Sequence, residues 1–333
     1  MFNYVVRRTV EAIPLLLLIS VILFAILSNA PGGPLAPYLQ NPHITAADIA
    51  RLKHNLGLDD PIYIQYIKWI ARVVGLQSDG ESQHFGNFGY STSNSETVTA
   101  AILERMPATL LLMGSAFTFS LIVGVAFGII AAIKPYSSVD YLVTTFAFFG
   151  QSMPVFWFAL MLQLAFAVNG INAFGYHIAL PSAGLSNSDD FNIGDRLQHL
   201  ILPTIVLSLL FLATWSRFTR SSMLEVLKTD YMRTAAAKGL DKMTIIMRHG
   251  LKNALMPVVT IVALSLPGLV AGAVVTETIF AWPGMGRLFI NALGQFDFSL
   301  LMGYLMMVSF LVVFFNLVAD VAYAWLDPRV KYD

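Results

Sequence analysis

Cysteine is absent from the 333 residues of this chain, and charged residues are few. The lack of cysteine excludes disulfide bonds, thiolate metal sites and a cysteine nucleophile. Asp, Glu, Lys and Arg make up 12% of the residues, whereas soluble domains carry about 25%. A soluble protein of this length could not cover its surface with so few charges, and 56% of the residues are hydrophobic. The solvent around most of the chain is therefore lipid.

Several functional motifs are also missing. The phosphate-binding loop G-x-x-x-x-G-K-[ST] does not occur, and no glycine is followed by lysine. The sequence has no catalytic triad, metal-ligand cluster or acid pair, so we expect neither an enzyme nor a bound cofactor or metal. His199 and His249 stand singly, which favours structural or docking roles over metal binding. A channel filter such as TVGYG and the internal repeats of secondary transporters are not found either.

Long apolar runs predict the architecture. Because about 20 apolar residues cross a bilayer core, six runs qualify, at 10–30, 108–133, 141–168, 200–215, 254–280 and 298–325. The fourth run is the shortest. Spanning strands would instead need alternating segments of about ten residues in a closed barrel. The sequence therefore predicts an all-α integral membrane protein with six transmembrane helices.

Lysine and arginine set the orientation. With the N-terminus inside, thirteen of the twenty basic residues lie on the inner side and seven on the outer side. Basic residues favour the cytoplasmic side, so both termini are expected there. A cleaved signal peptide is the alternative for the first run, because Arg7 and Arg8 precede it and residues 28–30 resemble a cleavage site. Its length favours a retained helix.

The outer segment 31–105 is long. Two amphipathic helices are expected in it, at 45–56 with Thr45 as N-cap and at 61–74, followed by a flexible connector at 77–96. The helices could lie among lipid headgroups, which suits Tyr and Trp. They could equally form a platform for an extracytoplasmic partner.

The inner side carries one strongly basic segment. Eight of the twenty basic residues lie between Arg217 and Lys252, against three acidic ones. A helix over 235–237 would stop at Gly239, and Asp241 would cap a second short helix. That helix would present one apolar face made of Met243, Ile246, Met247 and Leu251. Such a helix could insert into a partner's groove or lie on anionic lipid.

Eight motifs follow one another along the chain. They are LGLDDP (56–61), RMPATL (105–110), SMPVFW (152–157), HLILP (199–203), the segment 219–240, RHGLKN (248–253), TETIFAWPG (276–284) and LDPR (326–329). In this order they resemble the B-type membrane subunit of dipeptide, oligopeptide and nickel ABC importers. The resemblance implies an ABC type I importer-like permease in the cell inner membrane. The sequence departs from the family pattern at Gly33, where aspartate is usual.

The resemblance also implies a docking site and partners. The basic loop at 217–253 corresponds to the EAA region of the family, with Arg233 where glutamate is usual. The implied docking residues for an ATP-binding subunit are Arg233, Thr234, Ala235, Gly239, Met243, Ile246, Met247, Arg248 and His249. Two separate ATP-binding subunits would carry ATP and magnesium. A second permease and an extracytoplasmic solute-binding protein would complete the complex, with no nucleic acid.

Polar residues inside the apolar runs are candidates for the translocation path, because they are costly in lipid. They are Gln151, Ser152, Gln163, Glu277, Asn316 and Asp320. Hydrogen bonding between helices is the alternative, and it is favoured for Asn316 and Asp320, which share a helix face. Pro154, Pro257 and Pro267 are expected to shape helices.

The predicted function is a permease subunit of an ATP-driven importer of dipeptides or oligopeptides. Nickel, glutathione and oligosaccharide are alternative solutes, and a gradient-driven secondary transporter is the alternative of a different class. The predicted organisation has three parts: a first helix with the outer segment at 1–97, the permease domain at 98–327, and a cytoplasmic tail at 328–333.

Overall fold

The structure is a computed structural model, and it describes residues 2–39, 42–76, 86–173, 176–187, 192–265 and 273–326. The chain forms two compact units. Unit 1 comprises Met1–Thr109 and Pro283–Leu317, and unit 2 comprises Leu110–Trp282 and Val318–Asp333. The predicted boundary at residue 97 coincides with the start of α5 (Val98–Ile133), whereas the units change within that helix. The predicted tail at 328–333 and Pro267 lie outside the described residues.

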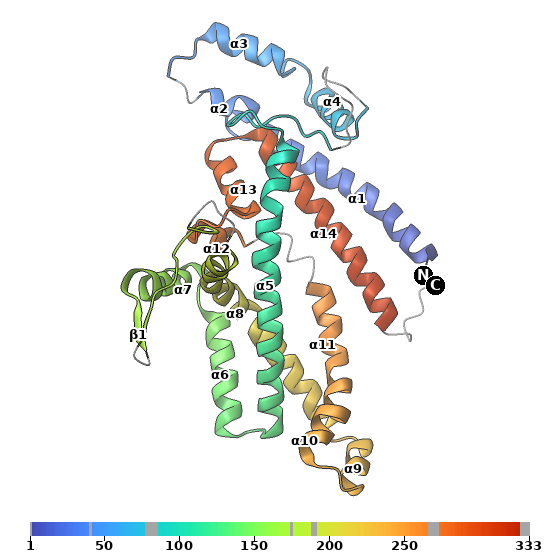
Figure 1. The fold of residues 1–333 in the computed structure, drawn as a ribbon. Coiled ribbons are helices and arrows are strands. Elements are labelled where there is room, and N and C mark those ends of the chain that lie inside the picture. The colour runs from blue at the N-terminus through green and yellow to red at the C-terminus, as the bar shows by residue number, and fades with distance from the viewer. Residues whose placement is uncertain are drawn as a thin grey trace. The chain divides into compact units, whose positions relative to one another are not determined.

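Unit 1 combines the N-terminal helices with α13 and most of α14 (Figure 1). Its elements are α1 (Phe2–Ser28), the short helices η1 (Gly33–Leu35) and α2 (Ala36–Leu39), α3 (Ala46–Asn55), α4 (Ile62–Val73), α13 (Met285–Gly294) and α14 (Phe298–Leu326). The core gathers apolar side chains from α1, α4, α5, α13 and α14. At Gly303 an added Cβ would lie 2.3 Å from Val98 Cγ1, so glycine permits a close approach within this core.

The two helices expected in the outer segment are both present. Thr45 caps α3 in a capping box with Asp48, and this hydrogen bonding lowers the pKa of Asp48. In α4, Tyr66 and Trp69 pack against Phe24 of α1, and the Tyr66 hydroxyl lies 2.8 Å from Ser20 Oγ. These two aromatic residues are therefore used for packing inside the chain. Residues 77–85 of the predicted connector lie outside the described residues.

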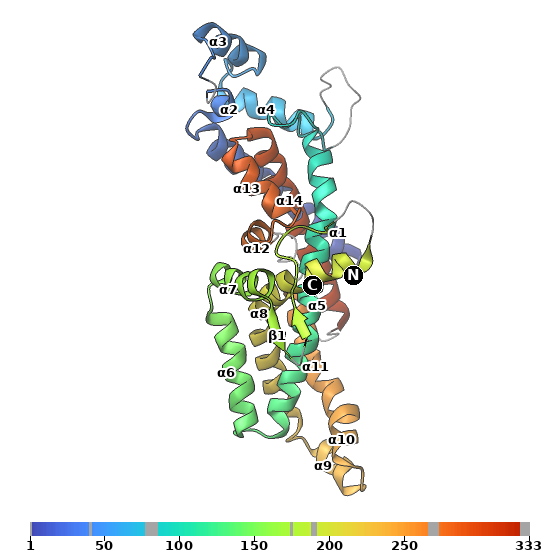
Figure 2. The same ribbon diagram turned by 60° about the vertical axis from the view of Figure 1, so that its left-hand side comes forward.

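Unit 2 is a group of helices with one small hairpin. Its elements are α6 (Ser138–Ser152), α7 (Val155–Leu162), the π-helix η2 (Gln163–Asn169), β1 (Ile171–Ala173), β2 (Tyr176–Ile178), α8 (Ile193–Val226), α9 (Asp230–Ala237), α10 (Lys242–Thr244), the π-helix η3 (Ile245–Gly250), α11 (Leu251–Ser265) and α12 (Val274–Ile279). The two strands pair antiparallel, with Ile171 opposite Ile178. In both views the turn from α5 to α6 lies at the same end of unit 2 as α9 and α10 (Figures 1 and 2).

The membrane-spanning prediction is only partly met. Four helices among the described residues are long and apolar enough to cross a membrane, Val5–Ser28, Val98–Ile133, Ile193–Val226 and Phe298–Val321. A bent pair, Ser138–Ser152 with Val155–Asn169, would make five. The protein is thus a helical membrane protein with four or five candidate spans. The predicted fifth span at 254–280 contains most of α11 and all of α12, with residues 266–272 between them outside the described part.

The predicted third span at 141–168 is not one straight helix. Its two halves meet at an angle of 104°, and the break falls at Met153 and Pro154. Proline restricts the preceding residue to extended conformations, and Met153 is extended with φ −75° and ψ 135°. Pro154 thus shapes the helix as predicted.

The predicted fourth span, 200–215, is too short. The corresponding helix, α8, has 34 residues and begins where the Asn192 side chain accepts hydrogen bonds from the Gly194 and Asp195 amides. Arg217 and Arg220 end the apolar run without ending the helix, because arginine favours helix as well as leucine does. The predicted basic loop at 217–253 therefore begins on α8, and only residues after Val226 leave that helix.

Candidate functional site

The basic segment after α8 folds as a short helix, a glycine turn and a second helix start. α9 ends at Ala237, and Gly239 then adopts φ +80°, a left-handed conformation that glycine tolerates. The carboxylate of Asp241 accepts a hydrogen bond from the Thr244 amide at 2.9 Å. This hydrogen bond lowers the pKa of Asp241 below its ordinary value. The predicted helix, glycine stop and N-cap are confirmed.

The helix that Asp241 caps does not remain a separate short helix. α10, η3 and α11 follow one another directly, and η3 is a π-helix, whose turns are wider than α-helical ones. Side chains at α-helical spacing therefore do not share one face here. Met243 and Met247 are 60% and 48% exposed, whereas Ile246 is 3% exposed. The prediction of a single apolar face with Met243, Ile246, Met247 and Leu251 is wrong for this reason.

The buried side of the segment packs against the end of α8. Met232, Ala235 and Ile245 form a buried cluster against Val226 and Leu227. Ile246 joins a second buried cluster that includes Ala132, Met223 and Ala254. Ala235 and Ile246 were among the predicted docking residues, but in this fold their side chains pack inside the chain. They hold the segment in place and do not belong to its surface.

The other predicted docking residues lie on the opposite, accessible side of the segment. Arg233, Thr234, Gly239, Met243, Met247 and Arg248 are exposed, and His249 is half-buried. We call these seven residues the exposed loop surface. Arg233 lies 3.3 Å from Asp230 but its side chain remains 76% exposed. The exposed loop surface thus combines basic side chains with two accessible methionines.

The predicted path residues of the third span lie on both sides of its bend. Gln151 and Ser152 are exposed at the end of α6, and the Ser152 hydroxyl donates to the Phe148 carbonyl at 2.8 Å. Gln163 begins η2, and its amide donates to the carbonyls of Ser182 and Ile279 at 2.7 and 3.1 Å. Gln163 therefore ties η2 to the end of α12, which fits the alternative of helix packing.

Glu277 lies on α12, two residues before the carbonyl that Gln163 contacts, and it is 0% exposed. The neighbouring residues Ile279 and Phe280 pack in a buried cluster with Leu202 and Val206. Gln163 and Glu277 are thus brought to one region. Gln151 and Ser152 lie on a different element, α6.

Asn316 and Asp320 both lie on α14, where Asn316 is exposed and Asp320 is half-buried. His199 is buried on α8, with Nδ1 3.2 Å from the Gly184 carbonyl and Nε2 3.6 Å from Asp195 Oδ1. His199 therefore links α8 to the segment that precedes it. Its surroundings suit the predicted structural role.

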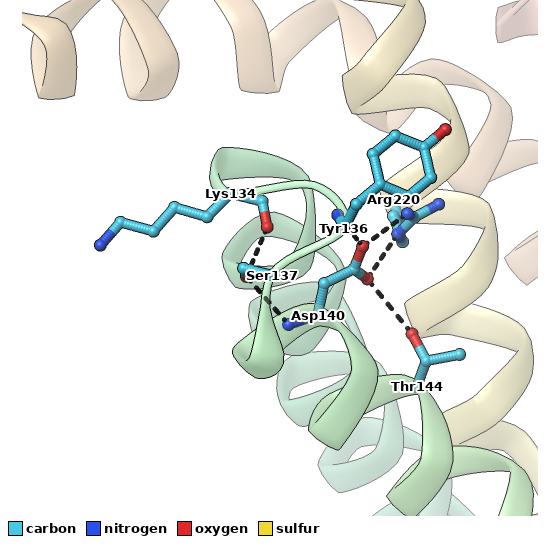
Figure 3. Close-up of polar contacts among 6 residues, drawn as sticks. All are labelled: Lys134, Tyr136, Ser137, Asp140, Thr144 and Arg220. Atoms are coloured by element: carbon cyan, nitrogen blue, oxygen red, sulfur yellow. Dashed lines mark hydrogen bonds and ion pairs between the residues drawn. The ribbon is translucent and has the colours of Figure 1, made fainter.

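Sequence reasoning missed a buried ion pair in unit 2 (Figure 3). Arg220 on α8 donates through Nε to Asp140 Oδ1 at 2.7 Å and through Nη2 to Asp140 Oδ2 at 2.6 Å. In the sequence Arg220 stands among the basic residues of the loop, and no pattern pairs it with Asp140. One local signal existed: Ser137 is an N-cap residue, and Asp140 stands three residues after it.

Known proteins resemble the chain over its full length. Residues 124–332 match the family described as binding-protein-dependent transport system inner membrane component, and residues 1–113 match its N-terminal family. The oligopeptide transport system permease protein AppB of Bacillus subtilis is 41% identical, covering 100% of both chains. The dipeptide transport system permease protein DppB of Escherichia coli K12 is 35% identical, covering 100% of this chain and 99% of the relative.

A solved structure shares the fold. The inward-facing MetNI methionine ABC transporter contains a chain that matches with a TM-score of 0.53 and 16% identity. The match covers 69% of this chain and 97% of that one. The chain belongs to the inner-membrane component family of binding-protein-dependent transport systems: it is a multi-pass permease subunit without enzymatic activity, and it works with an ATPase and a binding protein.

Proposed function

We propose that the solute of this importer is a dipeptide or oligopeptide. The observation that carries this proposal is the full-length identity of 35–41% to permeases whose names specify peptides. Among them, the DppB protein of Pseudomonas aeruginosa is named for di- and tripeptides and is 36% identical. Nickel, glutathione and oligosaccharide are the competing solutes.

The proposed topology has six spans with both termini in the cytoplasm. α11 and α12, with the residues between them, form the fifth span, and the bent pair α6 and α7 forms the third. One arrangement within unit 2 supports this topology: the α5–α6 turn lies at the same end as α9 and α10 (Figures 1 and 2). The topology assigns both to the inner side, together with Lys134 and most of the basic residues.

The exposed loop surface is proposed to dock on an ATP-binding subunit. Two such subunits would bind ATP and magnesium, and a second permease would pair with this chain. Met243 and Met247 support this assignment, because exposed methionines adapt to irregular grooves. ATP-driven closure of the ATP-binding subunits would move the docked loop and thereby shift the helices between outward and inward access.

The translocation path is proposed to include Gln151 and Ser152, which are exposed beside the bend between α6 and α7. Asn316 is exposed on α14 and is proposed with them. Gln163, Glu277 and Asp320 are less accessible. Their proposed part in the path therefore requires a second conformation in which these side chains become exposed to the path.

The test is transport by the complete complex, purified through a tag on this chain and reconstituted in vesicles with its binding protein. Uptake of a labelled dipeptide is expected to require ATP and to be insensitive to a proton or sodium gradient. Uptake of nickel, glutathione or an oligosaccharide in place of peptides would refute the proposed solute. Uptake driven by a gradient without ATP would refute the importer mechanism.

A further inference from the structure

The carboxylate of Asp140 is buried and fully engaged (Figure 3). Besides the two hydrogen bonds from Arg220, Oδ2 accepts from the Tyr136 amide at 2.8 Å, and Oδ1 accepts from the Thr144 hydroxyl at 3.3 Å. The Arg220 guanidinium also lies 5.9 Å from the centre of the Tyr136 ring. This single carboxylate thus joins the α5–α6 turn, the first turns of α6 and the helix α8.

The pair has the geometry of a fixed clamp. Arginine presents two parallel N–H groups to a carboxylate, which fixes direction as well as distance. The side chains of Asp140 and Arg220 are 4% and 25% exposed. Removing one partner of a buried pair leaves an uncompensated charge, which is far more costly than losing a surface pair. Lysine could replace the charge of Arg220 but not its planar fork.

The clamp lies near the end of α8, just before the segment that follows it, residues 227–250, which we call the docking loop. Arg220 is about two helical turns from Val226, the last residue of α8. Its neighbour Thr219, also on α8, is fully buried and packs closely against α5: an added Cβ at Gly128 of α5 would lie 2.5 Å from Thr219 Cβ. The same turn of α8 is therefore fixed on α5 by close packing and on α6 by the ion pair.

Beyond the clamp, α9 and η3 pack directly on the end of α8. Met223, Val226 and Leu227 supply the α8 side of the two buried clusters that hold the loop. Ala132 and Ile133, at the end of α5, belong to one of these clusters. The loop thus contacts the ends of both α8 and α5, and the clamp adds the polar link from α8 to α6.

We propose that Asp140 and Arg220 are positioning residues for transport. They make the docking loop, the end of α8 and the α5–α6 turn move as one body. Movement imposed on the loop is then passed to the spans and is not absorbed by bending at the end of α8. This role rests on the docking proposed above, and neither residue contacts solute in it.

A distance measurement tests the rigid connection within this chain. The natural chain has no cysteine, so spin labels can be placed at Lys134→Cys on the α5–α6 turn and Lys238→Cys on the docking loop, both exposed. In the complete complex, we expect one narrow distance distribution that is the same without nucleotide and with trapped ATP. With Asp140→Asn, the distribution should broaden about twofold or split into two. An unchanged width in that variant would overturn the proposal.

A second measurement separates positioning from mere stability. Asp140→Asn and Arg220→Lys should each lower peptide transported per ATP hydrolysed by about tenfold, while ATP hydrolysis by the assembled complex stays within about twofold. Reversal of both charges, Asp140→Arg with Arg220→Asp, should restore part of this ratio. If the variants reduce only the yield of complex and leave the ratio intact, the pair is a structural brace and the proposal fails. If Asp140→Asn does not assemble, Arg220→Lys decides both measurements.

Two control variants are matched to the pair. Thr144→Val removes only the longest hydrogen bond to Asp140, and Glu11→Gln removes the carboxylate of an exposed pair with Arg7 in the other unit. Both should leave the transport-to-ATP ratio unchanged. The distance test also distinguishes this proposal from the docking proposal, because loss of docking would release the ATP-binding subunit without broadening the distances inside unit 2.

Discussion

Two glycines set how closely α5 and α8 approach. An added Cβ at Gly124 would lie 2.6 Å from Trp215 Cβ, and one at Gly128 would lie 2.7 Å from the Ser216 carbonyl. Where α5 and α8 pack this closely, the Trp215 indole donates a buried hydrogen bond to the Ser120 hydroxyl at 3.1 Å. In lipid, where burial of apolar surface does not drive helices together, such close packing and polar contacts hold helices side by side.

Gly128→Ala should therefore destabilise the protein, because the methyl group has no space against Thr219 and Ser216. Overpacking of this kind costs about 1–3 kcal/mol. We expect a lower melting temperature of the purified complex. Gly114→Ala on the same helix is the control, since nothing lies within 4 Å of its added Cβ. Equal melting temperatures for the two variants would contradict the prediction.

Asp241 offers a prediction on pH. Its folded pKa lies below the ordinary value because the carboxylate accepts the Thr244 amide. The cap is therefore complete above the unfolded pKa, about 4, and is lost only as the pH falls through the lower folded pKa. Hydrogen exchange at α10 should be constant between about pH 5 and 8 after correction for the intrinsic rate. Asp241→Ala should raise exchange severalfold across that range, whereas Asp241→Asn, which can also cap, should raise it less. A pH-dependent change in the unmodified protein would contradict this assignment.

Local chemistry explains which residues could be predicted. Thr45, Gly239 and Asp241 act on groups within a few residues of themselves, so sequence spacing was sufficient. Asp140 and Arg220 are 80 positions apart, and no periodic pattern joins them. The burial of Ala235 and Ile246 likewise depends on how the loop folds back on α8.

At the scale of elements, hydropathy located the long helices but not their ends. Apolar composition marks contact with lipid, whereas helix ends depend on caps and turns. The end of the apolar run at Arg217 therefore did not mark the end of α8, which continues to Val226. The π-helix η3 is a second feature that sequence spacing could not predict. Spacing rules assume α-helical periodicity, and the wider turn at Ile245–Gly250 separates Ile246 from Met243 and Met247.

This separation predicts different outcomes for neighbouring positions of one helix. Met243→Asp and Met247→Asp, at exposed positions, should weaken association of the ATP-binding subunit about tenfold or more, as loss of interface anchors does. The measurement is the amount of that subunit that co-purifies with this chain as the detergent concentration of the washes is increased. The purified chain alone should keep its melting temperature.

Ile246→Asp is the contrasting variant, because it places a charge in a buried cluster. It should lower the melting temperature of the chain itself. Tyr63→Asp, an exposed apolar position on α4, should leave association of the ATP-binding subunit unchanged. If Met243→Asp and Met247→Asp both leave the association intact, the exposed loop surface is not the docking site.

At the scale of the whole molecule, the order of motifs carried more information than any single helix. Composition predicted a membrane protein, and the succession of motifs from 56 to 329 predicted the family, which the family match confirms. Neither could predict the 104° bend, the hairpin or the division into two units. These features depend on contacts between distant segments, such as the clustering of Val98 with Met285 and Met302 in unit 1.

Six spans with the N-terminus inside make a prediction that labelling can test directly. In the cysteine-free chain, a single cysteine at the exposed positions Asn94 or Asn291 should react with a membrane-impermeant maleimide in intact cells. A cysteine at Lys134 or Lys238 should react only after permeabilisation, because basic residues favour the cytoplasmic side. Asn291 is the decisive position: it follows the proposed fifth span, so protection of Asn291→Cys together with protection of Lys238→Cys would show that α11 and α12 do not cross the membrane.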